Sequence, residues 1–193
     1  RDGVGRNISR PLQGNGNIFT PDDLMNGNMP TGKVLIYDDD HYYMGGILAE
    51  LLATNGCEVT LVTPAPMISY WTQFTLEQDR VLKRLLGLNV TLLTHHTLAS
   101  HSLKTATVTN SITSAETTLA SDAVVMITDR IPNDSLYQEL KPALADGRLK
   151  SLRLIGDAEA PNIIAQAVFA GHLAAREFDE VIDPDVTPFK VER

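Results

Sequence analysis

Short apolar runs alternate with amphipathic stretches over most of the chain from Lys33 onward. Residues 34–37 form a continuous apolar run, which is typical of a strand buried on both faces of a parallel sheet. Apolar residues over 47–52 then recur with the spacing of one helical face, and Gly56 is a suitable stop for that helix. With the next strand-like run, over residues 57–62, they predict one βαβ unit, whose crossover is right-handed in nearly all proteins.

Strand-like and helix-like patterns continue to alternate toward the C-terminal end. Thr75 and Gln78 have the spacing of a capping box, which predicts the start of a second helix. The further predicted elements are a helix over about residues 75–87, strands over 89–93 and 123–127, a short helix near 135–140, a strand over 152–155, and a long helix over about 161–181.

Residues 98–119 differ from the rest because Thr and Ser dominate and apolar residues alternate with them. Turn residues at Asn110 and Ser114 divide this segment, so it predicts a small, half-exposed antiparallel meander. Together the elements predict an α/β, Rossmann-like three-layer fold with a parallel sheet and an antiparallel β-meander crossover. The first thirty residues hold five glycines and three prolines without a periodic apolar run, so they predict an extended loop, as does the tail after Asp183.

Composition narrows the classes of function. The 193 residues carry a formal net charge of −8, which disfavours nucleic acid as a partner because clustered Lys and Arg supply most of that affinity. Cys57 is the one cysteine, which excludes an internal disulfide and favours a reducing, cytoplasmic location. Apolar stretches fall short of the ~20 residues of a membrane span. No pair of histidines has metal-ligand spacing and no nucleophile or phosphate-loop motif occurs, so we expect no metal site and no catalytic residue in this chain.

The first candidate for ligand binding is the turn over residues 38–46, between the first predicted strand and helix. Doubly wound folds use Gly-x-Gly-x-x-Gly here, so that backbone amides and the helix N-terminus face a dinucleotide pyrophosphate. Gly45 and Gly46 remain, beside Tyr43, but three aspartates replace the other glycines. At ~5 Å each carboxylate–phosphate repulsion is on the order of 3 kcal/mol, which exceeds the ~0.3–1 kcal/mol from a helix dipole. Thr63 stands where an acidic residue or an arginine selects NAD or NADP, so neither is specified.

Gly156 and Asp157 are the second candidate, because they follow a predicted strand and precede the helix opened by Pro161. A carboxylate at this place can accept hydrogen bonds from ligand hydroxyls while the helix amides bind a phosphate or a flavin edge. The alternative is that Asp157 caps the last helix. The aromatic group Tyr70, Trp71 and Phe74 follows a strand end, and we expect it to pack against a neighbour.

Three segments, residues 33–64, 122–133 and 154–177, occur in an order that resembles the C-terminal part of the trimethylamine dehydrogenase-like flavoproteins. These belong to the NADH:flavin oxidoreductases, with dimethylamine and histamine dehydrogenases and, more distantly, 2,4-dienoyl-CoA reductase. In that family a TIM barrel carries FMN and a 4Fe–4S cluster, and an NAD-like domain is inserted into an FAD-like one. The resemblance implies a fragment of a larger, homo-oligomeric enzyme acting on small N-methyl amines, whose partners are the barrel and the FAD-like domain.

The resemblance also implies a division of the chain. Residues 1–32 and 149–193 belong to the FAD-like domain, and residues 33–148 form the NAD(P)-like domain. Gly156 and Asp157 match the closing Gly-Asp of the family, which contacts FAD or ADP.

Three functions remain open. The chain is an ADP- or FAD-type nucleotide module that has lost nicotinamide binding, a structural or docking domain, or a working NAD(P)H-binding reductase domain.

Overall fold

The structure is a computed structural model that describes residue 12 and residues 14–178. The chain divides into two compact units, which meet in sequence between Arg130 and Ile131. We call them the N-terminal unit and the C-terminal unit and describe each by itself. The predicted domain boundaries at residues 32 and 148 stay predictions.

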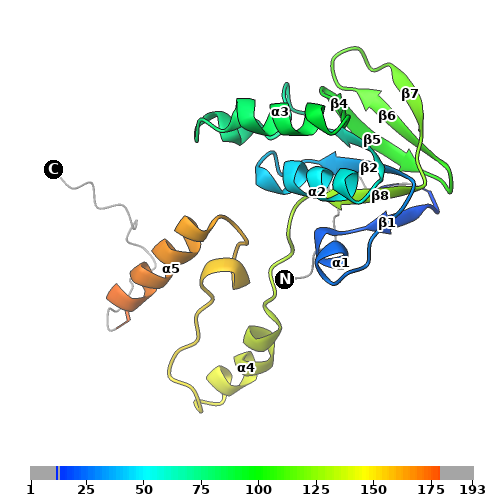
Figure 1. Cartoon of the computed structure of the whole chain (residues 1–193). Helices are drawn as coiled ribbons and strands as arrows, with labels where there is room; N and C mark the ends of the chain where they lie inside the picture. The colour runs from blue at the N-terminus through cyan, green and yellow to red at the C-terminus, as the bar shows by residue number, and fades with distance from the viewer. Residues whose placement is uncertain (1–11, 13, 179–193) are drawn as a thin grey trace. The chain divides into compact units, whose positions relative to one another are not determined.

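A parallel sheet forms the middle of the N-terminal unit (Figure 1). Its strand order within the described chain is β1-β8-β2-β3-β4, and all neighbouring pairs are parallel. The central strand β2 has no solvent exposure on either face from Val34 onward, as its continuous apolar run predicts. The strands are β1 (Asn17–Phe19), β2 (Lys33–Asp38), β3 (Glu58–Val62), β4 (Thr91–Leu93) and β8 (Ala123–Ile127).

Helices cover one face of this sheet. The helices α1 (Pro21–Met25), α2 (Tyr43–Thr54) and α3 (Gln78–Gly87) supply Leu24, Leu48 and Leu85 to one core. Val34 and Ile36 of β2 point into the same core. Every second residue of β2 therefore packs against helices.

An antiparallel sheet covers the other face. It consists of β5 (His96–His101), β6 (Thr105–Asn110) and β7 (Glu116–Ala120) in sequential order. Leu98 and Val108 of this sheet pack against Leu35 and Tyr37 of β2 in a second core. The three layers and the meander confirm the predicted fold class, and Asn110 makes the predicted turn by accepting hydrogen bonds from two following backbone amides.

The prediction of an extended loop for the first thirty residues is wrong for residues 17–25. β1 pairs with β8, and Thr20 caps α1 through a capping box with Asp23. The sequence pattern misses both elements because each is too short to show a period. Gly14 and Gly16 lie against His101, where a Cβ atom on either glycine would come within 2 Å of it.

The predicted start of the second helix is also wrong. The helix α3 begins at Gln78, after Glu77, and Thr75 caps nothing. The side chain of Gln78 instead donates to the Ile68 carbonyl and accepts from the Thr72 hydroxyl, at 2.6 Å each. Gln78 therefore anchors the preceding loop, which holds the short 3₁₀ helix η1 (Tyr70–Gln73).

The C-terminal unit contains α4 (Ser135–Ala145), the 3₁₀ helix η2 (Gly156–Ala158) and α5 (Ile164–Arg176). α4 extends five residues beyond its prediction, and α5 starts three residues after Pro161, while residues 179–181 lie outside the described chain. The predicted strand over 152–155 is absent from the described structure because no segment there pairs with its backbone. None of the described helices has the length and apolar character needed to cross a membrane.

Candidate functional site

The β2–α2 turn lies at the carboxyl edge of the parallel sheet. β2 ends at Asp38, beside Ile127 of β8, and the backbone amide of Asp39 donates to the Ile127 carbonyl at 2.8 Å. α2 then starts at Tyr43. Ligands of doubly wound folds bind outside this edge of the sheet, so the turn has the position of a nucleotide site.

Asp38 is the only one of the three aspartates that is fully buried, with 0% of its surface exposed. Its Oδ1 accepts hydrogen bonds from the backbone amides of Asp40 and His41, at 3.1 Å each. Its Oδ2 has no hydrogen-bond partner among the described residues. Desolvation raises the pKa of Asp38 to about 6, against the lowering effect of the His41 amide bond and the His41 charge.

His41 connects the turn to the next strand. It adopts a left-handed backbone conformation with φ 61°, and its Nδ1 lies 3.2 Å from the Thr63 hydroxyl. Its Nε2 lies 3.3 Å from a carboxylate oxygen of Asp39. This Asp39 contact raises the pKa of His41 despite its partial burial, and the charges of Asp38 and Asp40 act in the same direction. Thr63 is thus occupied with the turn itself.

The remaining candidates in the turn also make internal contacts. The Tyr43 hydroxyl donates to the Glu77 carboxylate, which raises the pKa of Tyr43 and lowers that of Glu77. A Cβ atom on Gly45 would lie 2.3 Å from Asp38 Oδ2, and one on Gly46 would lie 3.2 Å from the Ser69 hydroxyl. A side chain at Gly45 would therefore clash with Asp38, and one at Gly46 would be tightly packed.

Trp71 of η1 contacts the β2–α2 turn, because its backbone amide donates to the His41 carbonyl at 2.9 Å. The rings of Tyr70, Trp71 and Phe74 contact one another, with centroids 5.6 to 6.4 Å apart. Trp71 and Phe74 are nevertheless 48% and 67% exposed. The expectation that this group packs against a neighbour stays a prediction.

In the C-terminal unit, Gly156 and Asp157 form η2, ahead of α5. Gly156 has φ 59°, and a Cβ atom there would meet Ala167 of α5 at 3.6 Å. Asp157 Oδ1 accepts from the backbone amide of Asn162 at 3.1 Å. Both residues lie in the segment that leads into α5. Gly156 and Asp157 lie in one unit, and Tyr43, Gly45, Gly46 and Thr63 in the other.

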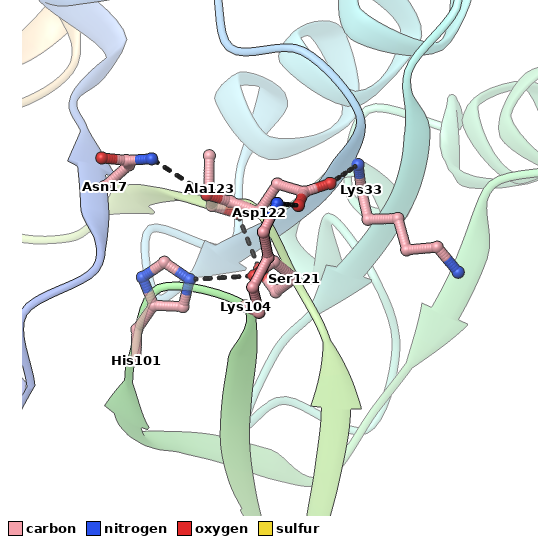
Figure 2. A network of polar contacts seen from close by, with 7 residues as sticks. All are labelled: Asn17, Lys33, His101, Lys104, Ser121, Asp122 and Ala123. Atoms are coloured by element: carbon pink, nitrogen blue, oxygen red, sulfur yellow. Dashed lines mark hydrogen bonds and ion pairs between the residues drawn. The ribbon is translucent and has the colours of Figure 1, made fainter.

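A polar network at the opposite edge of the parallel sheet joins the two sheets of the N-terminal unit (Figure 2). Asp122 accepts from the backbone amide of Lys33 at 2.8 Å and from Lys104 Nζ at 2.7 Å, and both contacts lower its pKa. His101 is 1% exposed and its Nε2 lies 3.3 Å from the Ser121 carbonyl. The network is structural, since its members bond to backbone groups of the strands.

Sequence analysis missed His101 because a register shift between Leu98 and Ser100 breaks the alternation that would have placed it inside. Among the described residues, no group of three His, Cys, Asp or Glu side chains could hold a metal ion. Cys57 is partly exposed, its thiol donates to the Pro30 carbonyl, and burial raises its pKa.

Comparison with known proteins identifies the family. Residues 19–111 match the OYE-like second alpha/beta domain. Dimethylamine dehydrogenase of Hyphomicrobium sp. (strain x) is 29% identical over 218 aligned positions, which cover 99% of this chain and 29% of that protein.

Solved structures agree. Histamine dehydrogenase from Rhizobium sp. 4-9 is 37% identical with a TM-score of 0.89, over 100% of this chain and 31% of that one. The 6-hydroxypseudooxynicotine amine oxidase from Pseudomonas geniculata N1 is 34% identical with a TM-score of 0.83, over 92% of this chain and 27% of that one. The chain thus spans about three tenths of the length of these relatives. It is similar to trimethylamine dehydrogenase-like oxidoreductases over its whole length, and its residues 19–111 match the OYE-like second alpha/beta domain.

Proposed function

We propose that this chain is the nucleotide-binding region of a larger flavin oxidoreductase that oxidises a small amine. The observation that carries the proposal is the similarity to histamine dehydrogenase over the whole chain. Dimethylamine, histamine and 6-hydroxypseudooxynicotine, which name the relatives, suggest an amine substrate. The substrate chemistry belongs to a part of the parent outside this chain, as do FMN and the 4Fe–4S cluster, since Cys57 alone cannot supply the four thiolates of a cluster.

The partner of the C-terminal unit is the rest of the parent chain. Ala143 is the only hydrophobic residue that this unit buries within its described part. One face of α4 exposes Leu136, Leu140 and Leu144, which recur at the four-residue spacing of neighbouring helical turns. α5 likewise exposes Ile164, Val168 and Phe169. Apolar area of this extent is typical of an interface. We place the parent in the cytoplasm as a homo-oligomer.

Gly156 and Asp157 are the residues that we assign to an ADP- or FAD-type nucleotide. They fit such a ligand because Gly156, with φ 59° and no side chain, lets the backbone turn closely against Ala167 of α5. Ile163 at the start of α5 makes no side-chain cap within the described residues, and the N-terminal end of a helix favours a negatively charged phosphate. Asp157 can accept a hydrogen bond from a ribose hydroxyl through its carboxylate.

The β2–α2 turn fits a nicotinamide dinucleotide poorly. Asp38 already accepts the hydrogen bonds of the Asp40 and His41 backbone amides, which a pyrophosphate in this turn would need as donors. Residues 33–148 are therefore proposed to keep the NAD(P)-like fold without that ligand, with Tyr43, Gly45, Gly46 and Thr63 serving the turn itself. A working NAD(P)H-binding reductase domain is the less favoured alternative.

Calorimetric titration tests the nucleotide proposal. ADP is expected to bind the full-length parent, and Asp157→Ala is expected to weaken that binding by about tenfold, the loss of one good hydrogen bond of about 1.4 kcal/mol. Glu159→Ala, three residues from the start of η2, is the matched control and is expected to bind ADP as the wild type does. Equal ADP affinity in all three proteins would contradict the assignment. Micromolar binding of NADH to this chain would instead favour the reductase alternative.

A structural or docking domain is the second candidate function. The exposed leucines of α4 favour it, because they need a covering surface whether or not a nucleotide binds. Failure of the parent to bind ADP at all would leave this function as the better one.

A further inference from the structure

We propose that the β2–α2 turn is an anion-binding turn that the carboxylate of Asp38 fills from within, so that removing this carboxylate opens the turn to a phosphate group. The inference deepens the proposed function, which treats the turn as closed to dinucleotides. It assigns the closure to one residue rather than to the summed charge of three.

The backbone of the turn is arranged around an anion. The amides of Asp40 and His41 both point at Asp38 Oδ1, at 3.1 Å. Two successive amides that converge on one oxygen are the arrangement with which such turns hold phosphate. His41 reaches this geometry through a left-handed conformation, φ 61°, which is uncommon for residues other than glycine. The turn therefore has the shape of an anion-binding turn.

The carboxylate also lies against the start of α2. Its Oδ2 would be 2.3 Å from a Cβ atom on Gly45, in the first turn of the helix. Tyr42, which precedes the helix, makes no side-chain cap within the described chain, and the first turn of α2 has no acidic residue. Asp38 is thus the anion that the positive end of α2 meets.

Two polar atoms beside this turn are left over. Asp38 Oδ2 and the Ser69 hydroxyl are both buried and both lack a hydrogen-bond partner within the described residues. The Ser69 hydroxyl lies next to Gly46, one residue along α2 from the glycine that meets Asp38. The Ser69 hydroxyl is thus a donor without an acceptor in the described chain, and the short carboxylate of Asp38 does not reach it. A phosphate group has more acceptor oxygens and can satisfy more donors.

The other two aspartates do not take the position of the Asp38 carboxylate. Asp40 is exposed and Asp39 is half-buried and in contact with His41. Asp40 therefore serves as a matched control, since it contributes the same charge to the same turn without occupying the anion position.

The test is calorimetric titration of the 193-residue chain with inorganic phosphate and, separately, with NADH, at neutral pH. The proteins are the wild type, Asp38→Ala, Asp38→Ser and Asp40→Ala. We expect the two Asp38 variants to bind phosphate at least about tenfold more tightly than the wild type, and Asp40→Ala to resemble the wild type. Asp38→Ser keeps a hydroxyl for the turn amides and covers the case in which Asp38→Ala fails to fold.

Each other outcome overturns the proposal. No gain in either Asp38 variant means that the turn is not an anion site. An equal gain in Asp40→Ala means that overall charge, and not occupancy, excludes phosphate. Unfolding of both Asp38 variants means that no anion-ready turn exists without the carboxylate.

The NADH arm separates the sources of the phosphate. If the Asp38 variants gain phosphate binding but not NADH binding, the filled turn is supported and its ligand is a free phosphate. If they gain binding of both, the ligand class extends to a dinucleotide. ADP binding by the full-length parent is expected to be the same with and without Asp38→Ala. The nucleotide proposal for Gly156 and Asp157 can therefore fail while this one holds, and the reverse.

Discussion

Asp38 is stabilised less in its charged form than in its protonated form, because burial raises its pKa from 3.8 to about 6. The folded protein binds a proton at this residue more tightly than the unfolded chain does. Between about pH 4 and pH 6 the Asp38 contribution to the free energy of unfolding therefore falls as pH rises, by roughly 3 kcal/mol in total.

Asp38→Asn removes this titration and keeps the shape of the side chain. We expect the free energy of unfolding of the variant, relative to the wild type, to rise by up to roughly 3 kcal/mol from pH 4 to pH 7. Urea unfolding of both proteins across this range measures the difference, in which the other titrating groups cancel. A difference that does not change with pH would show that folding does not raise the pKa of Asp38.

Asp39 is expected to control the protonation of His41. The contact between His41 Nε2 and Asp39 raises the pKa of His41 in the folded protein. Protonated His41 therefore stabilises the fold below the pKa that His41 has in the unfolded chain, and this stabilisation is lost as pH rises through its pKa in the folded protein. Asp39→Asn is expected to lower the His41 pKa, measured by NMR titration of the ring. Glu116→Gln in β7 removes the same charge from another layer and is expected to leave the pKa unchanged; an equal shift in both variants would contradict a specific contact.

The acidic turn shows how far single residues could be predicted. The sequence correctly places an aspartate-rich turn after a buried strand, but it treats Asp38, Asp39 and Asp40 alike. Residues 34–37 are apolar at every position, so they have no alternation that could show which side of the strand the next side chain takes. The direction of the Asp38 side chain depends on α2 and on Gly45, which only the folded structure supplies.

Gly45 shows the same dependence at the level of a helix. In a helix interior, Gly→Ala ordinarily stabilises by about 1 kcal/mol. At Gly45 the added Cβ would lie 2.3 Å from Asp38 Oδ2, and Asp38 has no room to move because it is buried. We therefore expect Gly45→Ala to destabilise the protein by about 1–3 kcal/mol, as overpacking does.

Thermal unfolding of three further proteins tests this expectation. Gly87→Ala is the control, because no described atom lies within 4 Å of its Cβ position at the end of α3. It is expected to be neutral or stabilising. In the Asp38→Ala background, Gly45→Ala is expected to lower the free energy of unfolding by less than it does in the wild type. Strict additivity in this cycle would rule out the contact.

Elements that bury a continuous apolar run were predicted well, and elements that depend on a distant partner were not. Residues 123–127 are predicted as a strand, and β8 has these bounds. Residues 152–155, in which Arg153 interrupts the apolar run, are also predicted as a strand but pair with no described segment. An apolar pattern indicates that a segment is buried. A strand also needs a neighbouring segment that hydrogen-bonds to its backbone, and the pattern says nothing about that neighbour.

The two units of the molecule are expected to differ in local stability. The N-terminal unit has two buried cores, whereas the C-terminal unit buries Ala143 alone among its described hydrophobic residues. Segments with few buried apolar contacts open at low free-energy cost. In limited proteolysis followed by mass spectrometry, the first cuts are expected in the C-terminal unit, which follows Arg130, while the sheet of the N-terminal unit stays intact. Early cuts within residues 33–127 would contradict this order.

Trp71 is the one tryptophan of the chain, and its backbone is bonded to His41 in the turn that Asp38 closes. Its indole is half exposed, so its fluorescence depends on solvent and on nearby charge. A change of protonation or the arrival of an anion in the turn would therefore be followed through the protein's own emission, without a label. The N-terminal unit therefore contains an intrinsic fluorescent probe next to the β2–α2 turn.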